Sequence, residues 1–343
     1  VSESKRTISD LGLKKSSAKL LPKGTLLFSS RATVGDVSIA LREVCTNQGF
    51  QSFIVNEDNS NEFLYNWIIK NKNLFLRRAS GSTFLEISKK EILKLNALIP
   101  SLPEQQKIAS FLSAVDEKIQ QLTKKKELLE QYKKGVMQQL FHSAGSGQAS
   151  GQLRFKDENG NPYPDWEEKR LGDLANINMG QSPDSKSYNE DSIGVLLIQG
   201  NADINGRITA PRQYTSEPTK TCEIGDLILT VRAPVGSVSK SVHKACIGRG
   251  VCSIVNKTNS IQDFLFQFLL SYEDKWGRLE QGSTFTAVSG KDIKTLKLKT
   301  PCIEEQQKIA TYLSSIDTKI EAVNNQITQT QTFKKGLLQQ MFV

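Results

Sequence analysis

Apolar residues recur every seven positions along residues 103–141, a spacing typical of a helix that pairs with another helix. Two rows share this spacing: Ile108, Val115, Leu122, Leu129 and Val136, and Leu112, Ile119 and Leu140. Lys126 and Lys133 interrupt the second row. Pro103 suits a first helical turn, and Glu104 would complement the positive end of the helix dipole. The pattern predicts one helix roughly 60 Å long, at about 1.5 Å per residue.

The same pattern returns near the end of the chain. Its two rows are Ile309, Ile316, Val323 and Leu337, and Leu313, Ile320, Ile327 and Met341. Thr330 and Lys334 interrupt it near the same end as in the first helix. Two separate amphipathic helices, each packed on its own domain, would also explain the pattern. The matched heptads favour a mutual, antiparallel coiled coil.

The helices belong to a larger internal repeat. The segment Glu104-Gln-Gln-Lys-Ile-Ala109 recurs as Glu305-Gln-Gln-Lys-Ile-Ala310, an offset of 305 − 104 = 201 residues. The same offset aligns three further pairs of segments: Gly24–Gly35 with Gly225–Gly236, Gly81–Phe84 with Gly282–Phe285, and Phe141 with Phe342. A repeat this long indicates two homologous domains, each a globular part followed by a long helix.

The globular parts combine strand and helix signals, so the predicted fold class is α+β. Residues 24–41 read as strand, turn and strand. Residues 62–76 carry an apolar stripe at helical spacing. Ser88 opens a capping-box pattern, and residues 98–102 form a short apolar run that predicts another strand.

Composition and repeat together predict five segments. They are a first domain at 1–102, a first long helix at 103–142, a flexible Gly/Ser linker at 143–152, a second domain at 153–303 and a second long helix at 304–343. Because residue 202 aligns with Val1, residues 153–201 have no counterpart in the first copy. We therefore expect the first domain to lack its opening segment, either as a truncation or as a natural short form.

Charge points to an acidic partner, and no motif points to catalysis. The chain has 45 Lys and Arg residues against 36 Asp and Glu, a net charge of +9, which favours a polyanion. Its two histidines lie in no metal-ligand or triad spacing, and the sequence has no phosphate-binding glycine loop. The five cysteines form no CxxC pair and suggest reduced thiols in a cytoplasmic protein. No apolar run is long enough to span a membrane. These features indicate recognition or assembly and not an enzyme.

These residues together resemble a known family, the specificity subunits of type I restriction–modification systems. The resemblance rests on the duplicated Glu-Gln-Gln-Lys-Ile-Ala helices. It also rests on Leu171-Gly-Asp-Leu174 after Trp166, and on Gly180-Gln-Ser-Pro183 at the start of the second domain. It implies two target-recognition domains, separated by the paired helices, that each read one half of a bipartite DNA site. It also implies two modification subunits and further restriction subunits as partners. S-adenosylmethionine, ATP and Mg would be bound by those partners and no cofactor by this chain.

The repeat suggests which residues of such a subunit would contact DNA. Residues kept in both copies cannot distinguish two half-sites and would hold the phosphate backbone: Arg31 and Arg232, Ser82 and Ser283, Thr83 and Thr284. Polar positions that differ between the copies are candidate base readers: Gln48 and Arg249, Arg42 and His243, Arg77 and Arg78 against Arg278. A structural role for the shared arginines, and a solvated surface position for each of the others, remain alternatives.

The repeated helix starts are candidate docking sites for the partner subunits. They comprise Glu104, Gln105 and Lys107 in the first copy and Glu305, Gln306 and Lys308 in the second. A non-catalytic coiled-coil scaffold without sequence-specific DNA binding is the competing interpretation. It would explain the heptads but not the basic charge or the divergent polar loops.

Overall fold

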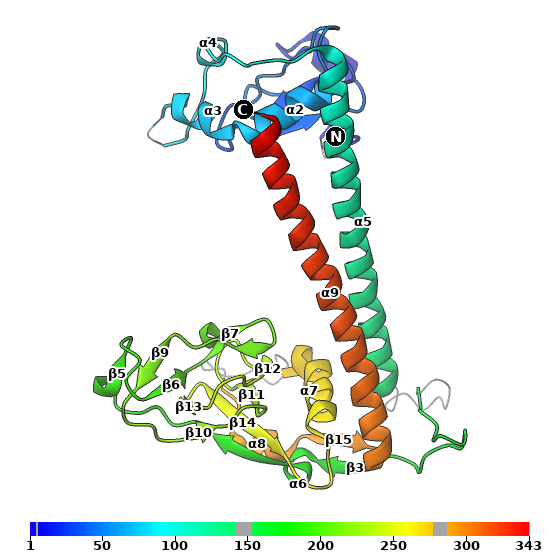
Figure 1. Ribbon diagram of the computed structural model, residues 1–343, viewed down its shortest axis with the longest axis vertical. Coiled ribbons are helices and arrows are strands. Elements are labelled where there is room, and N and C mark those ends of the chain that lie inside the picture. Colours follow the sequence, from blue (N-terminus) through cyan, green and yellow to red (C-terminus); the bar gives the residue numbers. More distant parts are fainter. Residues whose placement is uncertain (5, 82, 142–152, 277–286, 343) are drawn as a thin grey trace. The chain divides into compact units, whose positions relative to one another are not determined.

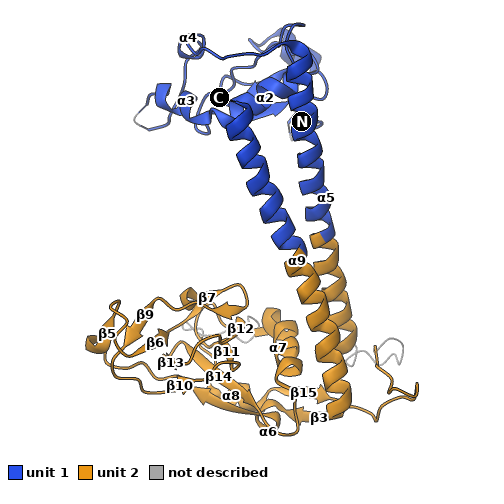
Figure 2. Ribbon diagram, in the orientation of Figure 1, with its two compact units in different colours: residues 1–125, 323–343 blue, residues 126–322 orange. Residues whose placement is uncertain are grey.

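The computed structural model describes residues 1–4, 6–81, 83–141, 153–276 and 287–342, and it divides into two compact units. Unit 1 contains residues 1–125 and 323–343, and unit 2 contains residues 126–322 (Figure 2). The two long helices, α5 (Leu102–Phe141) and α9 (Ile303–Met341), are labelled in Figure 1, and Figure 2 shows that each contributes one part to each unit. The predicted linker at 143–152 lies outside the described residues.

The globular part of unit 1 is small and mostly helical. Its elements are α1 (Asp10–Lys14), β1 (Leu26–Phe28), β2 (Val37–Ile39), α2 (Asn61–Lys70), α3 (Lys72–Arg78) and α4 (Lys89–Ile92). Strands β1 and β2 pair antiparallel, with Leu26 opposite Ile39, which is the predicted strand, turn and strand. The Ser88 side chain accepts a hydrogen bond from Glu91 N and caps α4, as its sequence indicates. Phe28 and Phe75 pack in the core, with ring centroids 4.8 Å apart.

The predicted strand at residues 98–102 is wrong, because no strand forms there and α5 begins at Leu102. Leu98 is 86% exposed and Ile99 is 39% exposed. The second copy shows the physical reason. There the residues that match 96–99 form β15 (Lys297–Thr300), which pairs antiparallel with β3 (Glu167–Arg170). That partner strand lies in residues 153–201, which align with no residues of the given sequence.

Unit 2 is built on two larger sheets. One has the order β4 (Ala175–Met179), β14 (Val251–Asn256), β11 (Leu227–Thr230), β12 (Val238–Lys240), β8 (Ile208–Thr209), β7 (Ile204–Asn205). The other has the order β10 (Thr221–Cys222), β13 (Ala245–Ile247), β6 (Val195–Ile198), β9 (Gln213–Thr215), β5 (Tyr188–Asn189). All pairs are antiparallel except β12 with β8 and β13 with β6. Strands β11 and β12 match β1 and β2 of unit 1.

Short helices complete unit 2 and help to bury its core. They are α6 (Leu171–Leu174), η1 (Ser185–Ser187), η2 (Asn201–Asp203), α7 (Gln262–Trp276) and α8 (Gly290–Thr295). The apolar face of α7 packs with strand β11 and with residues from both long helices, including Leu140 and Leu313. The globular part and the helix pair therefore share one hydrophobic core in this unit.

Helices α5 and α9 pair antiparallel, as the heptads predict. Lys334 Nζ lies 2.6 Å from Asp116 Oδ1 in unit 1, and Lys133 Nζ lies 2.6 Å from Asp317 Oδ1 in unit 2. Partner numbers thus fall along α9 as they rise along α5. The two ion pairs are related by the repeat, since 133 + 201 = 334 and 116 + 201 = 317. The lysines that interrupt the apolar rows therefore bind carboxylates on the facing helix.

Burial lowers the pKa of Lys133, while the hydrogen bond to Asp317 acts in the opposite direction. Within the described part of the chain, no helix combines the length and the apolar character that a membrane span requires.

Candidate nucleic-acid interface

In unit 1, two predicted DNA contacts lie at the carboxyl end of strand β1. Arg31 follows the strand, and the backbone of its neighbour Ser30 donates a hydrogen bond to Gly49 O at 2.8 Å, which places Gln48 beside it. Both side chains are exposed. Arg31 also forms an antiparallel bridge with Glu86, whose carboxylate is 3.8 Å from Arg31 Nε. An ion pair this exposed contributes little to stability, so the guanidinium can exchange it for a phosphate.

The loop at residues 80–86 borders the same strand end. Ala32 N donates to Leu85 O at 3.0 Å, which anchors this loop beside Arg31. Thr83 is exposed on the loop, and Arg77 and Arg78 are exposed at the end of the preceding helix α3. Arg78 Nη1 is 3.4 Å from Glu91 Oε2. The structure therefore gathers these candidates around one end of β1.

Unit 2 repeats this arrangement at the carboxyl end of β11. Val231 N donates to Gly250 O at 2.9 Å, so Arg232 and Arg249 extend from neighbouring strand ends. Arg232 bridges Ala287 through its backbone, as Arg31 bridges Glu86 in the other copy. Both arginines are exposed. No carboxylate among the described residues forms a salt bridge with either of them.

A tight turn presents Arg249. Arg249 N donates to Ser182 Oγ at 3.2 Å, and Gly248 N donates to Ile198 O at 2.8 Å. A Cβ atom at Gly250 would lie 2.0 Å from Gln199 O, so this position accepts only glycine. The turn is thus fixed against two neighbouring backbone segments, while its arginine points outside the core. A rigid turn with a free guanidinium suits the recognition of guanine in a major groove.

The turn also brings together side chains that the sequence analysis did not name as DNA contacts. Gln181 and Ser182 adjoin the turn through Ser182 Oγ and through a bond from Gln181 N to Ile247 O at 2.9 Å. Gln199 Nε2 donates to Gln213 Oε1 at 3.2 Å nearby. Three of these residues lie in the unmatched segment 153–201, where comparison between copies is impossible. The side-chain amides of Gln181, Gln199 and Gln213 are of the kind that pairs with adenine in a major groove.

Two predicted base readers lie elsewhere. Arg42 and His243 follow strands β2 and β12, at the opposite end of the hairpin from Arg31 and Arg232. His243 is half-buried, and its Nδ1 lies 3.1 Å from Thr209 Oγ1. The structure therefore places Arg42 and His243 away from the strand ends that hold Arg31 and Arg232. Ser82, Arg278, Ser283 and Thr284 lie outside the described residues.

The glutamines predicted to bind partners are buried in their own domains. Gln105 is 1% exposed; its Oε1 accepts from Ser60 N at 2.9 Å, and its Nε2 donates to Pro100 O at 2.9 Å. Gln306 repeats both bonds, with Ile261 N at 3.0 Å and Pro301 O at 3.0 Å. These side chains tie each long helix to its own globular part, so they cannot present a surface to a partner.

The remaining docking candidates differ between the copies. Glu305 is fully buried and Lys308 is half-buried, and both contact the segment that begins at Leu153. Glu104 and Lys107 are exposed in the first copy. The burial of Glu305 removes it, like the glutamines, from any partner surface.

All five cysteines are free thiols, and Cys222, Cys246 and Cys252 are buried. Burial raises the pKa of Cys252 to about 12, so this thiol stays protonated at neutral pH. Across the described ranges, no three His, Cys, Asp or Glu side chains gather as a metal site would require.

Comparison with known families finds one match along most of the chain. The family described as type I restriction modification DNA specificity domain matches residues 1–131 and 163–330. The type I restriction enzyme MjaX specificity subunit of Methanocaldococcus jannaschii is 35% identical over 275 residues, which is 78% of this chain and 64% of that protein. The MjaIX specificity subunit of the same organism is 34% identical over 56% of this chain and 45% of its own length. The chain thus spans less than two thirds of these curated relatives.

A solved structure shows the same fold. The HsdS subunit from Thermoanaerobacter tengcongensis has a TM-score of 0.52 and 23% identity, over 96% of this chain and 84% of that one.

Proposed function

Because this chain belongs to the family of type I restriction modification DNA specificity domains, we propose that it reads DNA for a type I restriction–modification complex. Each recognition domain would contact one part of a bipartite target. The methyl transfer and the cleavage would be carried out by partner subunits that bind S-adenosylmethionine, ATP and Mg.

One observation carries the proposal: both copies place a pair of candidate DNA contacts at the same end of the matching strand. In each copy a shared arginine, Arg31 or Arg232, lies beside a residue that differs, Gln48 or Arg249. A shared cation suits a contact that both half-sites offer, which is the phosphate backbone. A differing side chain suits a contact that distinguishes them, since glutamine pairs with adenine and arginine with guanine. The net charge of +9 agrees with such a role.

The experiment is a DNA shift assay over a series of salt concentrations, with the complete complex. We expect affinity to fall steeply with salt, and Arg232→Ala to weaken binding to all duplexes alike with a smaller salt slope. Lys244→Ala is the matched control, because it also removes one exposed positive charge. Lys244 follows His243, at the opposite end of the hairpin from Arg232. Equal effects of the two substitutions, or DNA binding independent of salt, would contradict a DNA contact at Arg232. Either result would favour a coiled-coil scaffold without sequence-specific DNA binding.

We also propose that two modification subunits dock on the exposed faces of the α5 and α9 pair, and that restriction subunits join them. The repeat supports this stoichiometry, because it gives the helix pair two related surfaces. Co-purification with the modification subunit should yield a 2:1 complex by mass measurement. Recovery of the specificity chain alone, with a folded partner present, would refute this arrangement.

A further inference from the structure

In unit 2, one end of the five-stranded sheet gathers polar side chains from three neighbouring strands (Figure 1). Strands β13 and β6 run parallel and both end here, and β9 begins here with Gln213 opposite Leu197 of β6. Gln199 directly follows β6, and Arg249 lies two residues after β13. Arg249 is exposed, while Gln199 and Gln213 are half-buried. Because neighbouring strands lie about 4.8 Å apart, these long side chains project from adjacent positions.

The backbone of Gln199 is held on two sides. Gln199 N donates to Asp203 Oδ2 at 2.7 Å, and Gly200 N donates to the same oxygen at 3.3 Å. On the other side, Gln199 O packs against Gly250, where an added Cβ atom would lie only 2.0 Å away. Gly250 follows Arg249 in the tight turn. The positions of Gln199 and Arg249 are therefore fixed relative to each other.

The side chain of Gln199 is oriented by Gln213. Side chains alternate between the faces of a sheet, so Gln199, Leu197 and Gln213 lie on one face. Gln199 Nε2 donates to Gln213 Oε1 at 3.2 Å. A glutamine amide has one acceptor oxygen and two N–H donors. The bond to Gln213 uses one donor, which leaves Oε1 and the second N–H of Gln199 at the end of the amide.

Adenine is the base that matches this remaining pair of groups. In the major groove it offers the N6 donor next to the N7 acceptor, whereas guanine offers two acceptors, cytosine a donor and thymine an acceptor beside a methyl group. The Gln213 bond also fixes which way round the Gln199 amide lies. A rotated amide would place its oxygen against Gln213 Oε1, where two acceptors would repel each other.

We propose that Gln199 reads an adenine directly next to the guanine that Arg249 reads, with Gln213 and Asp203 as its positioning residues. Consecutive base pairs rise about 3.4 Å, so two side chains from adjacent strand ends reach neighbouring pairs. The half-site of the second domain would then contain an A·T pair beside a G·C pair. The inference rests on the proposed DNA-reading function and assigns the base classes at this end of the sheet.

The test selects duplexes from a randomised DNA pool with the assembled complex, carrying the parent or a variant chain. Gln199→Ala should reduce the preference for adenine at one position by roughly tenfold, because the bidentate contact is lost. Gln199→Glu should change the preferred base there from adenine to cytosine, since a carboxylate only accepts hydrogen bonds. Both variants should keep the guanine that Arg249→Ala relaxes, which shows that the domain is folded.

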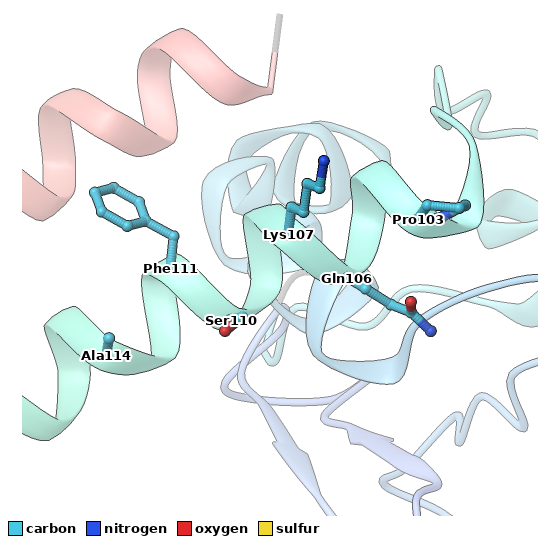
Figure 3. Close-up of a pocket in the computed structure, with 6 residues that line it drawn as sticks. All are labelled: Pro103, Gln106, Lys107, Ser110, Phe111 and Ala114. Atoms are coloured by element: carbon cyan, nitrogen blue, oxygen red, sulfur yellow. The ribbon is translucent and has the colours of Figure 1, made fainter.

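Substitutions of Gln213 separate orientation of Gln199 from a merely structural role. Gln213→Leu removes the acceptor and should weaken the same adenine preference, whereas Gln213→Glu still accepts from Gln199 Nε2 and should retain it. A structural role would lower the affinity for all duplexes and leave the base preference unchanged. Gln106→Ala is the matched control, because this glutamine lines a shallow surface groove on α5 (Figure 3) and should leave the selected motif unchanged.

The outcomes distinguish this inference from the function on which it rests. A parental motif without an A·T pair next to the position that Arg249→Ala relaxes would overturn the inference and leave DNA reading intact. Retention of adenine by Gln199→Ala or by Gln199→Glu would overturn it in the same way. Equal loss of adenine with Gln213→Leu and Gln213→Glu would overturn the positioning role. A parent that selects no motif would overturn DNA reading itself.

Discussion

At the scale of single residues, recurrence in both copies identifies shared positions. It does not show whether a shared residue is structural or available to a ligand. Gln105 and Gln306 recur because each long helix must be tied to the loop of its own domain. Arg31 and Arg232 recur in exposed positions at a strand end, where a ligand can reach them. The sequence shows both pairs as invariant between copies. Burial distinguishes the structural amides of the two glutamines from the accessible guanidinium groups of the two arginines. Because burial depends on distant parts of the chain, the sequence alone does not show this difference.

The buried glutamines give a direct stability prediction. Gln306→Leu keeps the apolar bulk but leaves Ile261 N and Pro301 O without their partners. Leaving such buried groups unsatisfied should lower the free energy of unfolding by about 1–3 kcal/mol. Urea unfolding measures this change, with the neighbouring exposed Gln307→Leu as control. Identical midpoints for the two variants would show that the bonds of Gln306 contribute nothing.

At the scale of elements, periodicity predicted the long helices well, because their burial follows the local heptad. The predicted starts and ends at 103–142 and 304–343 differ by no more than two residues from α5 and α9. The strand expected at 98–102 failed because a strand requires a partner. Leu98 and Ile99 are apolar, as in a strand, but β3, which pairs with β15 in the second copy, aligns with no residues of the given sequence.

The helix seam itself can be tested with one buried position. Leu122 is 6% exposed on α5, and Leu122→Asp would place an unpaired carboxylate among apolar side chains. We expect a loss of several kcal/mol, since an unpaired buried charge is strongly destabilising. Thermal unfolding provides the measurement, and Gln121→Asp, at an exposed position next to it, is the control. A variant that melts like the parent would exclude pairing of the two helices at Leu122.

The repeat-related ion pairs test the antiparallel register. Asp116→Lys should destabilise unit 1 by roughly 1 kcal/mol, between the values for exposed and buried pairs, because it faces Lys334 with a like charge. Adding Lys334→Asp should recover most of the loss by reversing the pair. Glu117→Lys, at an exposed neighbouring position, makes the same charge change as a control. A double variant no more stable than the single one would argue against this register.

At the scale of the whole molecule, the internal repeat predicts two homologous domains from the sequence alone. It could not predict how Gln181, Ser182 and Gln199 gather around Arg249, because that cluster joins loops far apart in the sequence. It also could not show that Arg42 and His243 lie away from the candidate face. Those positions differ between the copies, but residues of a solvated loop differ as readily as residues of a recognition site.

The linker between the first long helix and the second domain gives a prediction about the whole molecule. Residues 145–152 contain a duplicated tetrapeptide, Gly-Ser-Gly-Gln followed by Ala-Ser-Gly-Gln. Four residues reach at most about 13–14 Å, and a base pair rises about 3.4 Å. Deleting Ala149 to Gln152 should shorten the gap between the half-sites that the assembled complex reads and leave their sequences unchanged. Mapping of methylated sites measures both quantities. An unchanged gap would show that the helices alone set the spacing.

Selection of bound duplexes from a randomised DNA pool tests directly whether the chain reads DNA at the strand ends that hold Arg232 and Arg249. The assembled complex is prepared with the parent, Arg232→Ala or Arg249→Ala chain. If the two strand-end faces read DNA, Arg249→Ala should relax the preference at one half-site by roughly 1–3 kcal/mol and leave the other intact. Arg232→Ala should recover the parental motif from a weaker binder. The account is contradicted if Arg249→Ala selects the parental motif with full preference, or if Arg232→Ala alone changes the sequence selected.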